Sequence, residues 1–427
     1  DEERPTGRRT AARRGRGRGP GRGVGRGRGA GRARGRGRGA QHVAAATAAA
    51  VDTSSWSDED DAEHAGVLPN FHPAREPGAH LPDGVAYLKE LDFFQLYFGD
   101  AELEKIADAT NEYAWMLIAD YPCYGDKYGG WIECTASEIK RLIGLLLYMS
   151  LVKLPDLTDY WRTSSVFHGT WARSFIPARN RFRALMSFLH ISLPSAEDPE
   201  DRLRKLRWLN DHMKTRCKSY FQPHQALSVD ERMVRMKGRS HLRQYMPKKT
   251  IKWGIKLFAL ADVETSYLVD FDVYTGAVQG QTETGLTHAV VVNLTEPYQN
   301  AGYVVYTDNF YTSPNLATTL LQSQTHLVGT LRLNRLLVPP ELKSIKQFDK
   351  SERGAMRYVR NGQSIFVQWK DKRTVTMLST YHKATEHVMK ERQSKQGGQH
   401  VTIQVKTPAV IRDYNHGMGG VDVFDQR

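Results

Sequence analysis

Residues 226–230 (Ala-Leu-Ser-Val-Asp) and residues 303–308 (Tyr-Val-Val-Tyr-Thr-Asp) decide the fold. Both are short apolar segments rich in β-branched and aromatic residues, which predicts buried strands. Each segment ends on an aspartate, Asp230 in the first and Asp308 in the second. A carboxylate at the end of a buried strand loses hydration, and two such carboxylates side by side repel each other unless a cation lies between them. The pair therefore predicts a divalent metal site at the edge of a sheet.

Such a site needs a further acid. Mg²⁺ (or Mn²⁺) prefers a few carboxylates, with water and phosphate oxygens completing its octahedron, and two ions can clamp the attacking and leaving oxygens of a phosphodiester. Asp422, after Gly419-Gly420-Val421, is the candidate third acid, and Asp425, on the same helical face, is an additional one. Each acid taken alone has a simpler interpretation, as a turn cap or as a helix N-terminal acid favoured by the helix dipole. The presence of two such acids in one sheet favours metal binding over these simpler interpretations.

The chain that precedes the first aspartate has the periodicity of helices. Thr135, followed three residues later by Glu138, predicts a capping box that opens a helix. Apolar residues at helical spacing predict helices at four places: Leu91, Phe94, Leu96 and Tyr97; Leu103, Ile106 and Ala107; Ile139, Leu142, Ile143, Leu146 and Leu147; Phe182, Leu185, Met186 and Leu189. Residues 87–225 are therefore expected to form a mainly helical domain.

The pattern then changes to strands. Residues 251–261 and 267–274 predict a hairpin, and residues 326–331 predict another strand. Ser313-Pro314 predicts the N-cap and first turn of an intervening helix. Together with the two aspartate-bearing strands, these elements predict an α/β core over residues 226–334.

A separate β-rich piece is expected over residues 335–407. Within it, Asn361-Gly362 predicts a hairpin turn between strands at 356–360 and 364–369. Residues 408–427 are then expected to return to the core and to supply the third acid at the start of a helix.

Positive charge is concentrated at the N-terminal end. The formal net charge is +13, and residues 1–40 contain 14 Arg against three acids. Residues 7–39 approach a Gly-Arg repeat with almost no apolar surface to bury, which predicts disorder. An acidic stretch follows at residues 52–63, and residues 1–86 are expected to form a disordered leader. The Gly/Arg tract is equally typical of a salt-sensitive nucleic-acid arm and of a solubilising or targeting tail.

A second basic segment lies in the part expected to fold. Residues 202–256 contain 16 Lys and Arg against three acids. A metal site that holds a polyanion needs cations close to the substrate phosphate, which favours DNA contact over a solvated charged face. The candidate DNA-binding residues are Arg239, Arg243, Lys248, Lys249, Lys252 and Lys256.

The cysteines and the apolar runs exclude other classes. Cys123, Cys134 and Cys217 contain no CxxC pair, so the residues present predict neither a disulfide framework nor a zinc site, and a reducing compartment is expected. The longest apolar run, residues 142–152, is about half of the ~20 residues that cross a bilayer. No membrane association is expected.

Several motifs closely resemble those of piggyBac-like transposases, and the similarity extends from about Phe93 to the last residue. The motifs are Ser228-Val-Asp-Glu-Arg-Met, Lys237-Gly-Arg, Arg243-Gln-Tyr-Met-Pro-Lys-Lys, Lys252-Trp-Gly-Ile-Lys, Tyr306-Thr-Asp-Asn-Phe-Tyr-Thr-Ser, Gly419-Gly-Val-Asp-Val-Phe-Asp-Gln, Asn180-Arg-Phe-Arg and Phe188-Leu-His.

The resemblance implies an RNase H-like catalytic core in which Asp230, Asp308 and Asp422 are the catalytic and metal-binding triad, with two Mg²⁺ or Mn²⁺ ions. It also implies that residues 87–225 are the first part of a dimerisation and DNA-binding domain, that residues 335–407 are a β-rich insertion, and that the protein is a nuclear homodimer that acts on double-stranded DNA. The family continues with further helices and usually with a cysteine-rich zinc domain. The chain is therefore expected to be C-terminally truncated.

Three functions from different classes follow. The first is a cut-and-paste DNA transposase, for which the resemblance implies TTAA targets. The second is a domesticated, transposase-derived DNA-binding protein without turnover. The third is an RNA-binding protein that works through its Gly/Arg tail. The presence of all three acids favours the first over the second.

Overall fold

The computed structural model describes residues 69–84, 89–164, 171–247, 249–276, 285–396 and 399–426. The Gly/Arg tract, the acidic stretch and Lys248 lie outside these ranges, so the expectations for them are not tested. In the described ranges, no helix has both the length and the apolar character needed to span a bilayer.

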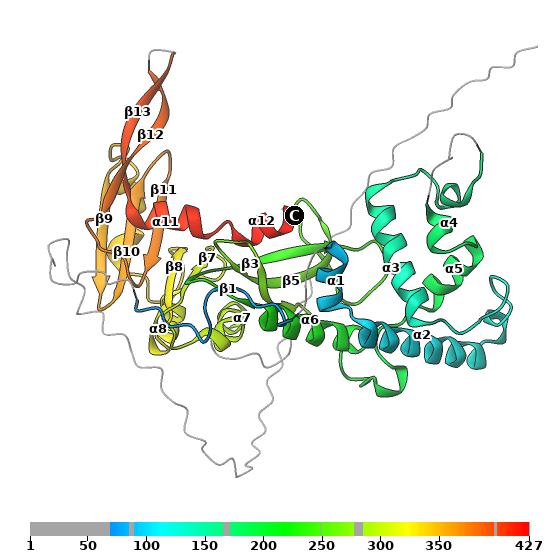
Figure 1. Cartoon of the computed structure of the whole chain (residues 1–427). Helices are drawn as coiled ribbons and strands as arrows, with labels where there is room; N and C mark the ends of the chain where they lie inside the picture. Colours follow the sequence, from blue (N-terminus) through cyan, green and yellow to red (C-terminus); the bar gives the residue numbers. More distant parts are fainter. Residues whose placement is uncertain are drawn as a thin grey trace, which may run out of the picture. The chain divides into compact units, whose positions relative to one another are not determined.

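Helices dominate the chain before residue 221, as the periodicity predicted (Figure 1). Their apolar faces meet in one core that includes Leu103, Leu142, Leu145, Leu185 and Phe188, all of which are almost fully buried. The helices are α1 (Glu90–Tyr97), α2 (Asp100–Asp120), α3 (Ala136–Leu151), α4 (Ala172–Phe175), α5 (Arg179–Phe188) and α6 (Arg207–Tyr220).

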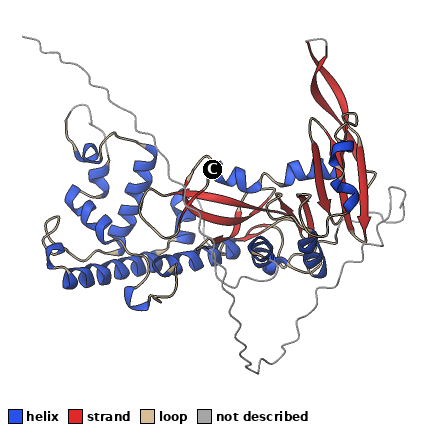
Figure 2. Ribbon diagram, turned by 180° about the vertical axis from the view of Figure 1, so that it is seen from behind, coloured by secondary structure: helices blue, strands red, loops and turns tan. Residues whose placement is uncertain are grey.

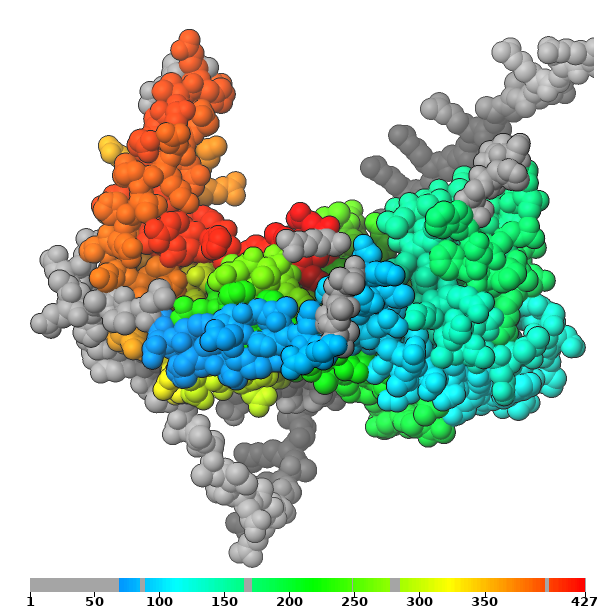
Figure 3. Space-filling view, in the orientation of Figure 1, coloured from blue at the N-terminus to red at the C-terminus, as the bar shows by residue number. Residues whose placement is uncertain are grey.

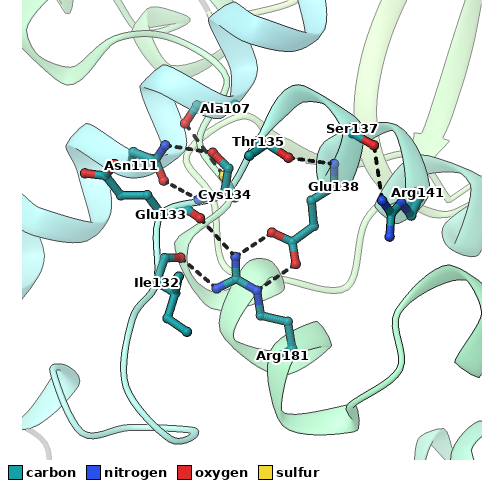
Figure 4. A network of polar contacts seen from close by, with 10 residues as sticks. All are labelled: Ala107, Asn111, Ile132, Glu133, Cys134, Thr135, Ser137, Glu138, Arg141 and Arg181. Carbon is teal, nitrogen blue, oxygen red and sulfur yellow. Dashed lines mark hydrogen bonds and ion pairs between the residues drawn. The ribbon is translucent and has the colours of Figure 1, made fainter.

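Of the two hydrogen bonds of the capping box predicted for α3, one is confirmed. The Thr135 hydroxyl accepts a hydrogen bond from the backbone N–H of Glu138 at 3.3 Å. The Glu138 side chain does not return to Thr135; it accepts two hydrogen bonds, of 2.7 and 2.5 Å, from Arg181 of α5. Arg181 also donates to the carbonyl of Ile132, so one guanidinium joins α5 to the start of α3 (Figure 4).

The strands form one large mixed sheet and two small ones (Figure 2). In the nine-stranded sheet the order is β4-β5-β3-β7-β8-β11-β10-β9, and β6 also pairs with β5; β3, β7 and β8 are parallel and the other pairs are antiparallel. Its strands are β3 (Ala226–Arg235), β4 (Arg243–Tyr245), β5 (Trp253–Asp262), β6 (Leu268–Val273), β7 (Val304–Thr307), β8 (His326–Thr330), β9 (Met356–Asn361), β10 (Ser364–Lys370) and β11 (Thr374–Ser379). The small sheets pair β1 (Gly78–Ala79) with β2 (Phe221–Gln222) and β12 (His387–Gln396) with β13 (Gln399–Pro408).

Helices cover both faces of the large sheet. On one face α7 (Leu286–Thr295) and α8 (Pro314–Gln322) pack against the inward side chains of β3, such as Leu227 and Val229. On the other face lie α11 (Ala409–Gly417) and α12 (Gly420–Gln426). The short helices α9 (Pro340–Lys343) and α10 (Ile345–Phe348) precede β9. The result is a three-layer arrangement of the α/β class that the sequence predicted, although no pattern had indicated α7.

Two expectations are corrected. Asp230 does not end its strand, because β3 continues to Arg235 and stays paired with β5 as far as Gly254. The strands at 356–379 are not a separate piece, because β11 pairs with β8 from Thr330 to Val328 and extends the same sheet. The physical reason is that β7 occupies only one edge of β8. The backbone groups on its other edge need hydrogen-bond partners, and β11 provides them. The hairpin turn at Asn361-Gly362 is confirmed.

A partly buried polar network joins α11 to the sheet. His382, which follows β11, bonds through Nδ1 with the Ser379 hydroxyl at 2.7 Å and through Nε2 with the Asp413 carboxylate at 3.0 Å. Arg412 also donates to Asp413, at 2.6 Å. Burial alone would raise the pKa of Asp413, but these two partners lower it to about 2. The charged form is therefore favoured in the folded state.

We expect Asp413→Asn to lower the free energy of unfolding by about 1–2 kcal/mol at pH 7, after allowance for partial solvent exposure. Because folding lowers this pKa, the stabilisation is complete above the unfolded value near 4 and is lost as pH falls toward 2. Urea unfolding of both proteins at several pH values measures the difference, which should shrink below pH 4. Asp126→Asn, at an exposed site, is the control and should change little; a pH-independent difference at Asp413 would contradict the assignment.

Candidate catalytic site

The parallel pairing of β3 and β7 brings two of the predicted acids together. Val229 lies opposite Thr307 in the register, and Asp230 and Asp308 are the residues that directly follow this pair in the chain. Asp308 follows β7 directly, as predicted, whereas Asp230 lies within β3. Both side chains are partly buried. Two carboxylates from neighbouring strands thus lie side by side.

The electrostatics of this pair are unfavourable without a cation. Burial raises the pKa of Asp230 to about 7; the charge of Lys249 opposes the shift, and those of Glu231 and Asp308 add to it. Burial also raises the pKa of Asp308, and the charge of Glu231 contributes. Such a pair is stabilised by a positive ion placed between its members. The donor set, partly buried carboxylate oxygens from two neighbouring strands, therefore fits a hard divalent cation.

Glu231 is a site residue that the sequence analysis missed. Its Oε2 accepts a hydrogen bond from the hydroxyl of Tyr311 at 3.2 Å, and its Oε1 lies 4.0 Å from Nζ of Lys249. Lys249 also donates to the backbone carbonyl of Glu231 at 3.2 Å. Glu231 stands inside the motif that begins at Ser228 and Tyr311 inside the one that begins at Tyr306, so the signal was present but unassigned.

Two arginines beside Asp308 were also missed. Nε of Arg332 donates to the side-chain oxygen of Asn309 at 2.8 Å, and its charge lowers the pKa of Asp308 in opposition to burial. Arg335 donates to the carbonyl of Phe310. Both follow β8 in the segment Gly329-Thr-Leu-Arg-Leu-Asn-Arg. They bring positive charge to the loop that carries the second acid.

The third predicted acid lies in the first turn of α12. Gly420 packs against Ser228, where an added Cβ would lie 3.2 Å from the serine Cβ, and Asp425 pairs with Arg232 at 2.5 Å. The helix therefore runs alongside the part of β3 that contains Asp230. Asp422 itself is exposed, and α12 is at the surface of the face drawn in Figure 3. The additional acid, Asp425, is engaged by Arg232.

Within the described ranges, no three Asp, Glu, His or Cys side chains form a group that could hold a metal ion. The structure thus brings Asp230 and Asp308 together and does not bring Asp422 into one ligand group with them.

The candidate DNA-binding residues fall into three groups. Lys249 and Lys256 lie near the acids: Nζ of Lys249 is 4.0 Å from Glu231, and burial lowers the pKa of Lys256 while the charges of Glu231, Asp230 and Asp308 oppose that shift. Arg243 donates to the carbonyl of Lys237 at 3.3 Å and lies 4.3 Å from the ring centre of Trp253. The third group is exposed and consists of Arg239 and Lys252.

These features define a class of protein. A mixed sheet between two helical layers, with acids on adjacent parallel strands, is the RNase H-like fold, as the resemblance implied. The family model described as Transposase IS4 matches residues 89–427, and the chain belongs to this family as a piggyBac-like transposase.

Similar proteins include human proteins and a transposase in a solved DNA complex. The chain is 25% identical over 368 residues to "PiggyBac transposable element-derived protein 2" of Homo sapiens, which is 84% of this chain and 60% of the relative. It is 28% identical over 342 residues to "PiggyBac transposable element-derived protein 3" of Homo sapiens, 78% of this chain and 55% of the relative. The chain thus spans 55–60% of the length of these relatives.

A cryo-EM structure of the piggyBac transposase synaptic complex with hairpin DNA superposes with a TM-score of 0.62 at 24% identity, over 79% of this chain and 67% of that one. This similarity establishes the fold.

Proposed function

We propose that the chain is the catalytic part of a cut-and-paste DNA transposase that hydrolyses one strand and then transfers the freed 3′ end. The observation that carries the proposal is the pair Asp230 and Asp308 on adjacent parallel strands, with raised pKa values and lysines and arginines around them. Such a pair suits metal-dependent phosphodiester chemistry. Retention of Asp422 in the first turn of α12 favours a catalytic protein over a domesticated DNA-binding protein without turnover.

In the proposed site Asp230 and Asp308 would hold two Mg²⁺ or Mn²⁺ ions together with Asp422. The ions would supply Lewis-acid activation of the phosphodiester when bound. Lys249, Lys256 and Arg332, whose charges interact with the pair, attract and orient the scissile phosphate, because charge-assisted hydrogen bonds to phosphate are strong and directional. Glu231 and Tyr311 fix Lys249 and the strand that carries Asp230.

The partner is double-stranded DNA, first the transposon ends and then target DNA, with TTAA as the proposed target. A homodimer in the nucleus is the proposed assembly and location. The DNA complex of the structural relative supports the choice of partner.

An excision assay tests the function. Cells that express the full-length gene product receive a reporter interrupted by an element with the protein's own inverted repeats. We expect restoration of the reporter and a repaired junction at TTAA. A protein that binds the transposon ends but does not excise the element would instead support the domesticated DNA-binding alternative. Preferential binding of RNA over DNA through the Gly/Arg tail would support the third function, an RNA-binding protein.

Deleting residues 1–40 should reduce affinity for duplex DNA without removing preference for transposon ends. The 14 arginines of this segment neutralise phosphates irrespective of sequence, and log affinity changes with log salt by about 0.9 per phosphate contact. Binding measured between 0.05 and about 0.2 M salt should therefore show a flatter slope for the shortened protein. Loss of end preference on deletion would contradict this division of roles.

Replacing Lys248 and Lys249 together by alanine should reduce strand cleavage more than DNA binding. Lys249 donates to Glu231 beside Asp230, so its loss misplaces the scissile phosphate, and a misplacement of about 1 Å costs on the order of 100-fold in rate. Cleavage under saturating DNA, compared with affinity in the same buffer, measures the two effects. Lys346→Ala with Lys350→Ala, on and just after α10, is the charge-matched control. Normal cleavage by the first variant would refute the role.

A further inference from the structure

We propose that the acidic stretch at residues 52–63 docks on its own chain, with the side chain of Trp56 inside a cavity of the helical region. The cavity has a volume of about 310 Å³ and lies between α2, the start of α6 and the segment that follows α5. Ligand sites range from roughly 300 to 1,000 Å³, so this volume suits one large side chain. The docking involves neither the catalytic site nor the proposed activity.

Much of the cavity wall is apolar. Four of its lining residues are Ile191, Leu193, Ala196 and Trp208. Leu193 is 40% exposed in spite of its apolar side chain. Contact with an aromatic side chain would remove this apolar surface from water, which is favourable.

One polar group of the wall lacks a partner. Ser192 lines the cavity and is 8% exposed, and its hydroxyl has no hydrogen bond with any residue in the described part of the chain. A buried polar group costs free energy unless it is hydrogen-bonded. The indole N–H of a tryptophan is a donor that needs an acceptor when it is buried. Trp56 can therefore satisfy the Ser192 hydroxyl, whereas a phenylalanine cannot.

The charged residues that line the cavity are all basic: Lys105, Arg204 and Arg207. Lys105 lies 5.9 Å from the ring centre of Trp208 and has no acidic partner within the ranges that the structure describes. The two arginines pair with acids outside the lining, but their side chains are still 37% and 46% exposed. Each guanidinium has five N–H donors, more than these pairs use. The rim of the cavity can therefore hold further carboxylates.

The acidic stretch has the complementary chemistry. Residues 52–63 contain six acids and neither Lys nor Arg. Trp56 lies directly before the run of acids at 58–61, and no other Trp, Tyr or Phe precedes Phe71 in the chain. A single aromatic side chain beside several carboxylates matches an apolar cavity with a basic rim.

The connecting chain is long enough for docking within one molecule. Residue 69 is the first described residue, and Arg75 donates to two backbone carbonyls at the end of α6. Trp208 lies ten residues before the first of these carbonyls on the same helix, a distance of about 15 Å. Residues 69–75 add at most about 20 Å, whereas the chain from Trp56 to residue 69 can span about 43 Å.

A fluorescent peptide with the sequence of residues 50–65 tests whether the cavity is already occupied. Its affinity is measured for the 427-residue parent chain and for the Trp56→Ala chain, which lacks the competing side chain. We expect the Trp56→Ala chain to bind the peptide at least about tenfold more tightly, because an attached segment competes at an effective concentration near the millimolar range. A Trp56→Phe peptide should bind roughly fivefold more weakly than the natural peptide, owing to the lost hydrogen bond.

A second substitution locates the docking site. Leu193→Asp, made in the Trp56→Ala chain, places a negative charge among the basic residues of the cavity and should abolish peptide binding. Leu336→Asp, at a residue that is 79% exposed and lies after β8, is the matched control and should change the affinity less than about twofold. Both leucines are exposed, so thermal melting of the two variants should stay close to that of the parent.

Equal affinity of the peptide for the parent and the Trp56→Ala chain would overturn the proposal, because the attached segment would not compete. A Trp56→Ala peptide that bound as tightly as the natural one would show charge attraction alone and overturn it as well. Equal binding by the Leu193→Asp and Leu336→Asp variants would place the peptide on another surface. A parent dimer in size-exclusion chromatography that the Trp56→Ala chain does not form would assign the cavity to a second copy and refute docking within one chain.

Discussion

Asp230→Asn, Asp308→Asn and Asp422→Asn should each abolish strand cleavage, a loss of at least about 1000-fold, while affinity for DNA stays within about threefold. The reason is that Asp230 and Asp308 lie side by side on β3 and β7 and would hold the metal ions, whereas affinity depends on phosphate contacts made by other residues. Nicking of a labelled transposon-end duplex, with Mg²⁺ or Mn²⁺ and with the metal chelated, measures cleavage, and filter binding measures affinity.

Asp272→Asn is the matched control, because this carboxylate pairs with Lys214 of α6 at 2.6 Å, away from the two acids. The Asp272→Asn variant should cleave the transposon-end duplex at the rate of the parent chain. Full activity of Asp422→Asn alone would remove that residue from the triad and keep the other two. Metal-independent cleavage by the parent chain would refute the whole assignment.

Gly329→Ala should destabilise the fold by about 3 kcal/mol. An added Cβ on this β8 residue would lie 2.1 Å from the hydroxyl of Thr312 and 2.6 Å from the carbonyl of Thr307. These two threonines bond to each other at 2.7 Å and are fully buried, so they have no room to move. Because Thr307 directly precedes Asp308, the same change should also lower cleavage.

Chemical unfolding in urea, followed by circular dichroism, measures this effect. Gly419→Ala is the control, since nothing lies within 4 Å of the added atom, and its free energy of unfolding should change by less than about 0.5 kcal/mol. Equal stabilities of the Gly329 variant and the parent chain would mean that β7 and β8 are further apart than the structure shows.

The layout of the core could be predicted from the sequence because local rules and packing agree there. Ser313 caps α8 by accepting from the N–H of Leu316 at 3.2 Å, as its position before Pro314 indicated. The two acids were found because a carboxylate after a buried apolar run is rare enough to be informative. The length of β3 was not found, because Asp230, Glu231 and Arg232 are polar and interrupt the apolar pattern that defines a strand.

The surroundings of the acids could not be predicted, since they depend on long-range contacts. Arg332 is 24 residues from Asp308 in the chain, and only the pairing of β8 with β7 brings its loop to that acid. Trp253, at the start of β5, is 47% exposed, and the guanidinium of Arg243 lies 4.3 Å from the centre of its ring. Nothing in the spacing of its neighbours distinguishes the outer end of β5 from its buried part.

The pairing of β11 with β8 has a practical consequence for anyone who shortens this protein. Deleting residues 335–407 as if they were a separate domain would remove β11, the strand that pairs with the outer edge of β8. The freed N–H and C=O groups would then form an open, apolar edge only one strand away from Asp308, and such edges recruit other chains into aggregates. A soluble minimal version should therefore keep β9, β10 and β11, and trimming is safer at the β12–β13 ribbon, whose two strands pair only with each other.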